Sequence, residues 1–482
     1  MIITVGNSYS YISKHFNVLA QQLQNKIIKK LCYYKKSARG YGYNEVALFF
    51  KNVNNQTNER YYQFPTGLLT TLIKFLRQND VQFSFIDDRG EKPPQLPIAE
   101  FYKNLKKIDP DKEERDYQVE AITLALQCGR GVVSHSTAAG KTLAISGIAF
   151  CVNCRTLILC KGIEHVDQIS NDIAMYTGRR VTCIRRGQYD DRGPIIVSNV
   201  QQLQAIKEKD YNKFRRLLAG FKCVIGDEIH HAGSTTWKEI FYFAINAYHR
   251  YGFSGTVFRE DNAEMEIVAA VGPVFHNIDQ NYLTTEGYIS PAHFLFIDPM
   301  CYTIDGEDDV WPVAYYKGIL ENEKRNRWLA SICDVYQRRG SQVLVITSIR
   351  ESHGRSLQKM ISNSVFVSGK SAKYHREQAL KNFKEKQFGV LIGTSVYDEV
   401  INLPDVRCVI MAGGGKAHNA VYQRIGRGLR TAEGKSHVDI IVPWDSHSSV
   451  LLRHSIRVLE LIKKVDVWRE HVKFIGNYRK EV

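Results

Sequence analysis

The sequence predicts an α/β protein in which a small mixed α/β domain precedes two tandem parallel-sheet domains. Apolar, strand-like runs alternate with helix-like segments over about residues 115–288, and a second series of this kind begins near residue 321. The first of these strand-like runs is followed by Gly140-Lys141-Thr142, a sequence motif typical of phosphate-binding loops. At 482 residues the chain is too long for one hydrophobic core, so several domains are expected.

Residues 1–88 are expected to form the small N-terminal domain, and their charge is one-sided. No acidic residue precedes Glu45, whereas lysines are frequent there and tyrosines lie among them. Basic side chains interleaved with aromatic ones suit phosphate contacts and stacking. The pattern therefore predicts DNA binding by Lys29, Lys30, Lys35 and Lys36. The alternative is a solvated basic face on a small domain.

The other boundaries follow from composition and periodicity. Three prolines in a polar context indicate a linker after the N-terminal domain. The expected division is an N-terminal domain at 1–88, a linker at 89–110, a first parallel-sheet domain at 111–288, an inter-domain connection at 289–320 and a second parallel-sheet domain at 321–482. Strands are expected in the two series at 131–134, 156–160, 195–198, 223–226 and 250–254, and at 342–347, 364–367, 390–393, 408–412 and 437–442. Apolar residues at helical spacing predict a packing helix at 446–474.

The overall composition points to a polyanionic partner. The net charge is +15 and the isoelectric point is near 9.2, which favours nucleic acid before a membrane surface. No apolar run approaches the roughly 18–20 residues that span a bilayer, and the start of the chain lacks a signal-peptide pattern. We therefore expect no membrane partner and a cytoplasmic location. Cys151 and Cys154 are expected to be buried free thiols and not a zinc or redox pair.

The phosphate-binding loop is the first candidate site. Its backbone N–H groups at a helix start are expected to cradle phosphates, Lys141 to reach the β/γ-phosphates, and the Thr142 hydroxyl to ligate Mg²⁺. His135 stands where such loops usually carry their first glycine. The residues expected to bind ATP here are Ser136, Thr137, Ala138, Ala139, Gly140, Lys141 and Thr142.

A pair of carboxylates about 85 residues after the phosphate-binding loop is the second candidate site. An apolar strand at 222–226 ends in Asp227 and Glu228, which are followed by Ile229 and His230. ATP hydrolysis needs one carboxylate in the Mg²⁺ shell and another that orients and deprotonates the attacking water. We assign the first role to Asp227 and the second to Glu228.

The third pattern is an arginine-rich segment at 423–430. It reads Gln-x-x-Gly-Arg-x-x-Arg, and its arginines and glycines argue against a simple packing helix. Arginine is suited to stabilising charge on a transferring γ-phosphoryl group. If the two parallel-sheet domains face each other, Arg427 and Arg430 can complete a site begun by Lys141 and Asp227. Such a site converts hydrolysis into relative domain motion.

With these patterns in order, the sequence resembles the superfamily 2 helicases over about residues 115–445. The resemblance implies two RecA-like motor domains that use ATP and Mg²⁺. Residues 62–69, residues 287–291 and the compact motor resemble the UvsW-type phage helicases, relatives of RecG and XPB in motor pattern. Members of that group remodel branched DNA, and a phage-encoded protein would work in the host-cell cytoplasm.

The resemblance also assigns roles to individual residues. It gives adenine recognition to Arg115 and Gln118. It places the coupling between nucleotide state and nucleic acid at His230, Ser254 and Thr256. Contacts to the DNA backbone are expected by motif position at Ser198, Ser348 and Thr394. The last motif supplies Gln423, Arg427 and Arg430.

Three residues depart from the pattern of the family. Ala138 stands where the loop usually has a glycine, so its backbone freedom is reduced. Val400 and Asn402 stand where the family usually has Gly and Asp, and an asparagine cannot carry the charge of an aspartate.

The leading hypothesis is an ATP-dependent DNA helicase or translocase that unwinds or branch-migrates forks, Holliday junctions or R-loops in recombination, repair or replication. We expect it to act as a monomer, with a 3′-to-5′ polarity implied by the resemblance. One alternative is an RNA helicase, and a second is the motor subunit of a restriction system. A third is a DNA-binding module with a decayed ATPase, against which the intact Gly140-Lys141-Thr142, Asp227, Glu228 and Arg427 argue.

Overall fold

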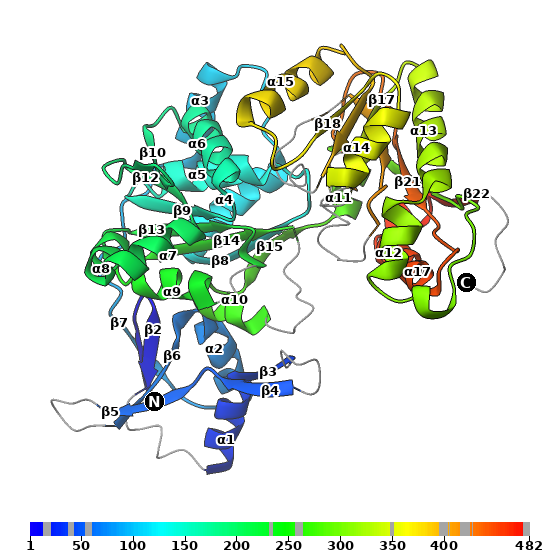
Figure 1. The fold of residues 1–482 in the computed structure, drawn as a ribbon. Helices are drawn as coiled ribbons and strands as arrows, with labels where there is room; N and C mark the ends of the chain where they lie inside the picture. The colour runs from blue at the N-terminus through cyan, green and yellow to red at the C-terminus, as the bar shows by residue number, and fades with distance from the viewer. Residues whose placement is uncertain are drawn as a thin grey trace. The chain divides into compact units, whose positions relative to one another are not determined.

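The computed structural model describes residues 1–12, 21–36, 43–53, 60–230, 235–255, 264–347, 351–394, 403, 405–414, 425–426 and 428–475. The chain forms two compact units. The first comprises Met1–Ser136 and Gly140–Ile278, and the second comprises Thr137–Ala139 and Asp279–Val482. A mixed sheet near the N-terminus and two large, mainly parallel sheets carry the architecture, which confirms the predicted α/β class (Figure 1).

The N-terminal sheet has the strand order β5-β6-β2-β1-β7, and a separate ladder pairs β3 with β4. Its elements are β1 (Ile2–Val5), β2 (Tyr9–Ile12), α1 (Gln21–Lys30), β3 (Cys32–Lys36), β4 (Tyr43–Ala47), β5 (Phe50–Val53), β6 (Arg60–Pro65), α2 (Leu69–Gln78) and β7 (Ser84–Asp87). Alternate residues of β1 and β2 are buried, as expected for strands with one face on a core. Ile3, Phe64 and Leu72 lie at the centre of that core.

This N-terminal sheet shares its core with the first parallel-sheet domain. Ala269, on α10 (Glu264–Ala270), belongs to the same cluster of buried apolar residues. Gly67 lies so near this helix that an added Cβ would be 1.9 Å from the carbonyl oxygen of Val268. Only a glycine permits this approach of the two backbones. The N-terminal residues are therefore packed as part of the first unit.

A buried arginine reinforces that junction. Arg250, on β14 (His249–Ser254), is fully buried, and its Nη2 donates to Ser8 Oγ at 2.9 Å. The same guanidinium donates to the carbonyl oxygens of Phe241, Ala244 and Ala247. Burial lowers the pKa of Arg250 to about 10, so the group keeps its charge at neutral pH. Four hydrogen bonds thus replace the water that a buried cation loses.

The first parallel sheet has the order β11-β10-β12-β9-β13-β14-β8-β15, and β11 is its antiparallel member. Its strands are β8 (Arg130–His135), β9 (Thr156–Cys160), β10 (Val181–Arg185), β11 (Gln188–Tyr189), β12 (Ile195–Asn199), β13 (Cys223–Asp227), β14 and β15 (Val274–Ile278). One core packs under α4 (Asp116–Cys128), α5 (Lys141–Cys151) and α6 (Ile163–Thr177). The other packs under α7 (Val200–Lys209), α8 (Tyr211–Ala219) and α9 (Thr235–Phe243), so helices cover both faces (Figure 1).

The segment for which the sequence predicts a linker contains a helix. This helix is α3 (Ile98–Ile108), and it packs against α5 and α6. Phe101, Tyr102 and Leu105 are buried in the core of the first parallel-sheet domain. Pro97 directly precedes the helix, a place where proline is compatible with helix initiation. The three prolines therefore lead into a helix start.

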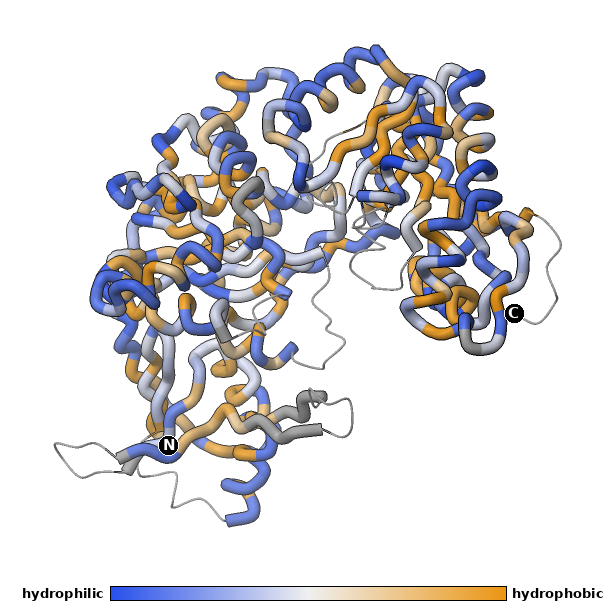
Figure 2. Tube along the Cα trace, viewed as in Figure 1, coloured by the Kyte–Doolittle hydropathy of each residue, from blue (hydrophilic) through white to orange (hydrophobic). Residues whose placement is uncertain are grey.

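The second unit is built on a wholly parallel sheet with the order β18-β19-β17-β20-β21-β16-β22. Its strands are β16 (Ala292–Ile297), β17 (Gln342–Ile346), β18 (Ser364–Val367), β19 (Val390–Gly393), β20 (Val406–Ile410), β21 (Val438–Pro443) and β22 (Val472–Ile475). Its helices include α11 (Gln280–Thr285), α12 (Val313–Tyr315), α13 (Glu323–Arg338), α14 (Glu351–Met360), α15 (Lys373–Lys384), α17 (Ser449–Lys463) and α18 (Asp466–Arg469). In Figure 2 hydrophobic residues follow the central strands of this sheet, as burial on both faces requires.

Two elements of the second unit differ from the sequence predictions. β16 lies inside the segment expected to be a connection, between β21 and β22 in the sheet. The expected packing helix at 446–474 ends early, because α17 stops at Lys463 and the last residues form β22. β22 pairs with β16, so hydrogen bonds to a distant strand decide its conformation.

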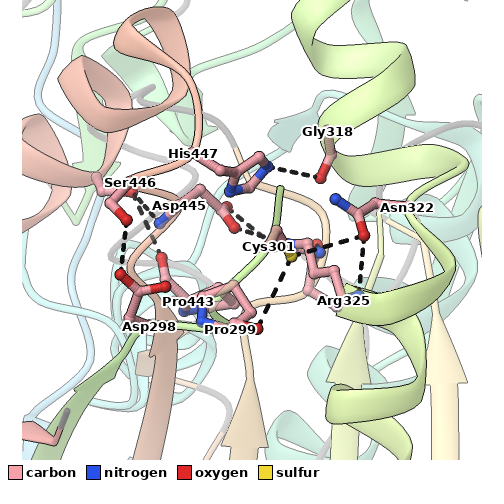
Figure 3. A network of polar contacts seen from close by, with 12 residues as sticks. Asp298, Pro299, Cys301, Gly318, Asn322, Arg325, Pro443, Asp445, Ser446 and His447 are labelled. Atoms are coloured by element: carbon pink, nitrogen blue, oxygen red, sulfur yellow. Dashed lines mark hydrogen bonds and ion pairs between the residues drawn. The ribbon is translucent and has the colours of Figure 1, made fainter. Parts of the chain in front are cut away.

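A buried ion pair fixes the start of α13 (Figure 3). Arg325 is fully buried, and its Nε and Nη2 donate to the two carboxylate oxygens of Asp445 at 2.7 and 3.1 Å. Nη1 of the same residue donates to Ala412 O at 2.9 Å. The Asn322 side chain caps the helix by accepting from the Arg325 N–H at 3.0 Å. These contacts tie α13 to the loops that follow β20 and β21.

Candidate ATP site

The phosphate-binding loop joins β8 to α5. α5 starts at Lys141, directly after Gly140, whose φ is +77°. The loop begins with the Ser136 N–H donating to Ile278 O at 3.0 Å, which ties it to the end of β15. The first N–H groups of a helix have no partner within the helix and favour negative charge. The start of α5 therefore offers the donor set that phosphates need.

His135 supports this loop from the protein interior. Its side chain is fully buried, and Nε2 lies 2.9 Å from Nδ1 of His276 on β15. The ring also meets Tyr117 edge-on, with 5.6 Å between centroids. Burial, with His276 and Lys141 nearby, lowers the pKa of His135 to about 3, so the imidazole is neutral. The residue that replaces the first glycine is thus a core residue.

Ala138 adopts the conformation that a glycine would adopt. Its φ is +72°, in the left-handed region that L-residues with a Cβ rarely occupy. The departure noted in the sequence is therefore a strained position, because the family's glycine is lost while the backbone shape is kept.

The two carboxylates lie at the end of β13, and Glu228 contacts the loop lysine. Glu228 Oε1 is 3.1 Å from Lys141 Nζ, and Oε2 is 3.2 Å from His230 Nδ1. Asp227 Oδ1 accepts the Glu228 N–H at 3.0 Å, and the φ of Glu228 is +52°. Burial disfavours the ionised Glu228, but Lys141 and His230 more than offset this and hold its pKa well below the usual range. A carboxylate that is ionised at neutral pH is what a general base requires.

His230 continues this chain of contacts to the next strand. Its Nδ1 lies 3.0 Å from Ser254 Oγ at the end of β14, and both residues are buried. β13 and β14 are neighbours in the sheet, with Asp227 paired to Phe253. The structure thus brings together His230 and Ser254, which the sequence assigns to coupling, whereas Thr256 lies outside the described residues.

The predicted adenine-binding residues start α4, beside the loop. Gln118 is buried, and its Nε2 is 3.4 Å from Gly140 O. A Cβ on Gly140 would lie 2.5 Å from that nitrogen, so a side chain there would displace Gln118. Arg115 Nη1 donates to Tyr117 OH at 3.0 Å. Gln118 therefore packs directly against the phosphate-binding loop at Gly140. Its contact with the adenine base stays a prediction.

In the second unit, the end of the arginine-rich segment is held by its main chain. Arg430 O accepts from Lys435 Nζ at 2.8 Å and from Ser290 Oγ at 3.3 Å. Ser290 N also donates to Leu429 O at 2.6 Å. Burial, together with the nearby Arg407, lowers the pKa of Lys435 to about 8. Gln423 and Arg427 lie outside the described residues, as do Val400 and Asn402.

The predicted DNA contacts have varied surroundings. Lys29 and Lys30 are exposed in the last turn of α1, and Lys35 and Lys36 belong to β3. Ser198 is fully buried, and its hydroxyl donates to Ile184 O at 2.7 Å, so the structure gives this predicted contact no support. Thr394 is also buried, directly after β19. Ser348 lies outside the described residues.

Several supporting residues carry no signal in the sequence. His276 contacts His135 of the loop, and Ser290 and Lys435 contact the main chain of the arginine-rich segment, yet His276 and Lys435 belong to no recognisable motif. The segment 287–291 that resembles phage helicases contains Ser290, which is the one hint available.

Comparison with known proteins decides the family. Residues 111–259 match the family described as "Type III restriction enzyme, res subunit". Residues 324–432 match the "Helicase conserved C-terminal domain". The first match lies in the domain of the first parallel sheet and contains the phosphate-binding loop and the two carboxylates. The second lies in the domain of the second parallel sheet and contains the arginine-rich segment.

The chain belongs to the superfamily 2 helicases. It is an ATP-dependent helicase, an enzyme that hydrolyses ATP, and its parallel-sheet domains are the two RecA-like domains of this superfamily. Superfamily 2 helicases use ATP with Mg²⁺. None of the described helices is long and apolar enough to cross a membrane.

Two curated relatives are similar to most of this helicase. "ATP-dependent DNA helicase uvsW" of Enterobacteria phage T4 is 23% identical over 414 residues, which is 79% of this chain and 78% of the relative. "DNA 3'-5' translocase XPB2" of Sulfurisphaera tokodaii is 22% identical over 356 residues, 66% of this chain and 79% of the relative.

Two solved structures share the fold of this helicase. Dbp5 of S. cerevisiae, bound to RNA and ADP BeF3, aligns with a TM-score of 0.53 at 14% identity and covers 80% of this chain and 95% of that one. The helicase MrfA, bound to DNA and AMPPNP, aligns with a TM-score of 0.54 at 15% identity and covers 77% and 54%.

Proposed function

We propose that this helicase is a DNA translocase that remodels branched DNA, such as forks, Holliday junctions and R-loops, in recombination, repair or replication. The observation that carries the motor part of this proposal is the continuous polar chain from Lys141 through Glu228 and His230 to Ser254. It connects the phosphate loop to the strand end to which the resemblance to superfamily 2 helicases assigns nucleic-acid coupling. We propose further that the protein acts as a monomer, which its sedimentation with and without DNA tests.

The residues of the site fit ATP and Mg²⁺. The loop has the helix start and the left-handed Gly140 that bring backbone N–H groups to phosphates. Thr142 and Asp227 would hold Mg²⁺, which when bound neutralises phosphate charge. Lys141 binds the β/γ-phosphates, and Glu228 orients the attacking water and accepts its proton. Arg427 and Arg430 stabilise the charge on the transferring phosphoryl group.

Substitution of the two central residues tests the ATP site. Lys141→Ala and Glu228→Gln should each lower DNA-stimulated ATP hydrolysis by about 100-fold or more, because each removes a group that acts on the transferring phosphoryl or its water. DNA binding should survive in both variants. Lys222→Ala, an exposed lysine just before the same strand, is the control and should hydrolyse ATP normally. Persistent hydrolysis in Glu228→Gln would show that another group is the base.

The choice of DNA rests on charge and on relatives. The net charge is +15, Lys29 and Lys30 are exposed, and the phage and archaeal relatives are named as a DNA helicase and a DNA 3'-5' translocase. Replacing Lys29, Lys30, Lys35 and Lys36 by Gln should weaken binding to all sequences. It should also flatten the dependence of affinity on salt, because fewer counterions are released. An unchanged salt dependence would leave these lysines as a solvated face.

A substrate comparison tests the branched-DNA role. ATP hydrolysis and strand separation are measured on forked DNA, four-way junctions, single strands and RNA–DNA hybrids. We expect the highest turnover on forks and junctions, with 3′-to-5′ movement. Greater stimulation by RNA than by duplex DNA would favour the RNA helicase alternative.

One observation favours a second candidate function, the motor of a restriction system. The family that matches residues 111–259 is described as a restriction-enzyme subunit. In this candidate function the protein would move along duplex DNA without separating its strands and would need a nuclease partner. Displacement of a bound triplex strand from unbranched duplex, without unwinding of forks, would support this candidate.

A further inference from the structure

The second unit carries a cluster of imidazole and carboxylate groups that belong to none of the motifs named above. His293 is the second residue of β16, Asp439 is the second residue of β21, His437 directly precedes β21 and His471 directly precedes β22. The order β21-β16-β22 places these three strands side by side. The cluster therefore lies at the amino-terminal edge of the sheet, opposite the edge where the strands end.

The strand register aligns the side chains of the cluster. His293 pairs with Asp439 across β16 and β21, and Phe294 pairs with Val472 across β16 and β22. His471 therefore stands next to His293 in the row that crosses the three strands. Residues two apart on a strand share a face of the sheet, which puts His437 on the same side as Asp439.

The distances within the cluster are short. The ring centroids of His293 and His437 are 4.2 Å apart, and those of His293 and His471 are 4.8 Å apart. His437 Nε2 is 3.6 Å from Asp439 Oδ1. One ligand atom from each of His293, His437 and Asp439 lies within 4.8 Å of the others. Zinc binds nitrogen and carboxylate oxygen at about 2.0–2.2 Å, so small side-chain rotations would bring these atoms into a coordination sphere.

Neighbouring residues orient two of the ligands. Ser436 Oγ is 2.9 Å from His437 Nδ1, which leaves Nε2 directed at Asp439. Tyr336 OH donates to Asp439 Oδ2 at 2.6 Å, which leaves Oδ1 for the imidazoles. Metal sites use outer hydrogen bonds of this kind to fix the tautomer and orientation of their ligands.

The charge balance of the cluster also suits a cation. Three imidazoles face one carboxylate, and all four residues are partly buried. An imidazole nitrogen offers the lone pair that binds a metal ion. Rings stacked at short range gain little from one another, whereas a shared cation would join them.

We propose that His293, His437 and Asp439, with His471 beside them, form a binding site for a zinc-like transition-metal ion. Imidazole nitrogen with one carboxylate is a donor set for Zn²⁺ and its neighbours, while Mg²⁺ prefers oxygen ligands throughout. The bound ion cross-links β21, β16 and β22. β22 is the edge strand of the sheet and pairs only with β16 among the described strands, so the ion stabilises the last of the described strands.

The site also adjoins the segments that hold the arginine-rich motif. Ser290 precedes β16 by two residues, and Lys435 precedes β21 by three; both contact Arg430 O. A metal that fixes the starts of β16 and β21 fixes these two contacts as well. The proposal concerns structure and does not depend on which nucleic acid the helicase uses.

Metal binding to the full-length protein tests the proposal. After removal of metal with a chelator, the protein is titrated with Zn²⁺ in competition with a chromophoric chelator, and its thermal unfolding is followed with and without Zn²⁺. The wild type should bind one equivalent and unfold at a higher temperature with Zn²⁺, and Mg²⁺ should not raise it in the same way. Co²⁺ serves as a spectroscopic probe that should give visible absorption without thiolate charge-transfer bands.

Variants separate the cluster from other ligands. His293→Ala, His437→Gln and Asp439→Asn should each weaken Zn²⁺ binding by about 10- to 100-fold and abolish the thermal shift. His375→Ala, an exposed histidine on α15, should bind as the wild type does. Circular dichroism before metal addition identifies any variant that has failed to fold, and the others decide the test. Absence of uptake by the wild type, or undiminished uptake by the folded variants, would overturn the proposal.

Discussion

The substitution Ala138→Gly should stabilise the phosphate-binding loop. Ala138 has a φ of +72°, and the left-handed conformation costs an L-residue about 1–2 kcal/mol. Glycine adopts this conformation freely but loses about 0.5–1 kcal/mol more backbone entropy on folding than alanine does. The difference lies between about 0 and 1.5 kcal/mol, with a midpoint of about 0.75 kcal/mol, and is the expected gain in the free energy of unfolding.

The neighbouring residue provides a matched control. Ala139 is fully buried and its φ is not positive. Ala139→Gly therefore adds the entropy cost of glycine without relieving strain and removes a buried methyl group worth about 0.8 kcal/mol. We expect it to lower the free energy of unfolding by about 1–2 kcal/mol. The two adjacent substitutions should thus act in opposite directions.

Hydrogen exchange of peptides from β8 and α5, measured at increasing urea, reports the stability of the segments on both sides of the loop separately from that of the rest of the protein. ATP hydrolysis should be retained in Ala138→Gly, because the backbone N–H groups of the loop keep their positions. If Ala138→Gly destabilises the region as much as Ala139→Gly does, the left-handed alanine is not a source of strain.

Three further substitutions test long-range contacts. Arg325→Met should lower the free energy of unfolding by about 3–5 kcal/mol, because it leaves Asp445 buried without a countercharge. Urea denaturation followed by tryptophan fluorescence measures this change. A loss below about 1 kcal/mol would mean that water reaches the Asp445 carboxylate. Ser254→Ala removes the partner of His230 and should lower strand separation more than ATP hydrolysis, whereas equal losses would contradict a coupling role. Arg250→Met leaves carbonyl oxygens without donors, at about 1–3 kcal/mol each. Limited proteolysis should then release the N-terminal residues faster than in the wild type, and unchanged cleavage would show that the apolar core alone holds them.

Strands of the two parallel sheets could be predicted because their signal is local. The expected runs at 156–160 and 390–393 coincide with β9 and β19, since a strand buried on both faces is apolar throughout. The run at 364–367 coincides with the edge strand β18, which is only partly buried. β10 and β15 were not expected, because their sequences mix apolar and polar residues and pair with neighbours that only the fold supplies. The helix α3 was not predicted, because the prolines that precede it are typical of a linker.

The candidate site likewise contains residues that the sequence could predict and contacts that it could not. Lys141, Asp227 and Glu228 could be proposed as site residues from the sequence because they lie in short motifs, and the structure places Lys141 beside Glu228. Their catalytic roles stay predictions. The contacts that hold the site in shape join residues that are far apart along the chain. His135 and His276 are separated by 141 residues, and Ser8 and Arg250 by 242. No local pattern predicts such pairs, because nothing near either residue in the sequence identifies its distant partner.

The two irregular positions of the phosphate-binding loop therefore have different physical origins. His135 replaces a glycine without strain, since its imidazole is neutral, buried and bonded to His276. Ala138 replaces a glycine with strain, since the backbone keeps the left-handed turn. If the first is compensated by packing and the second is not, a glycine at 138 should stabilise the protein, whereas His135→Gly should destabilise it by several kcal/mol through the cavity it leaves. A destabilising effect of both would mean that Ala138 also makes contacts on which the loop depends.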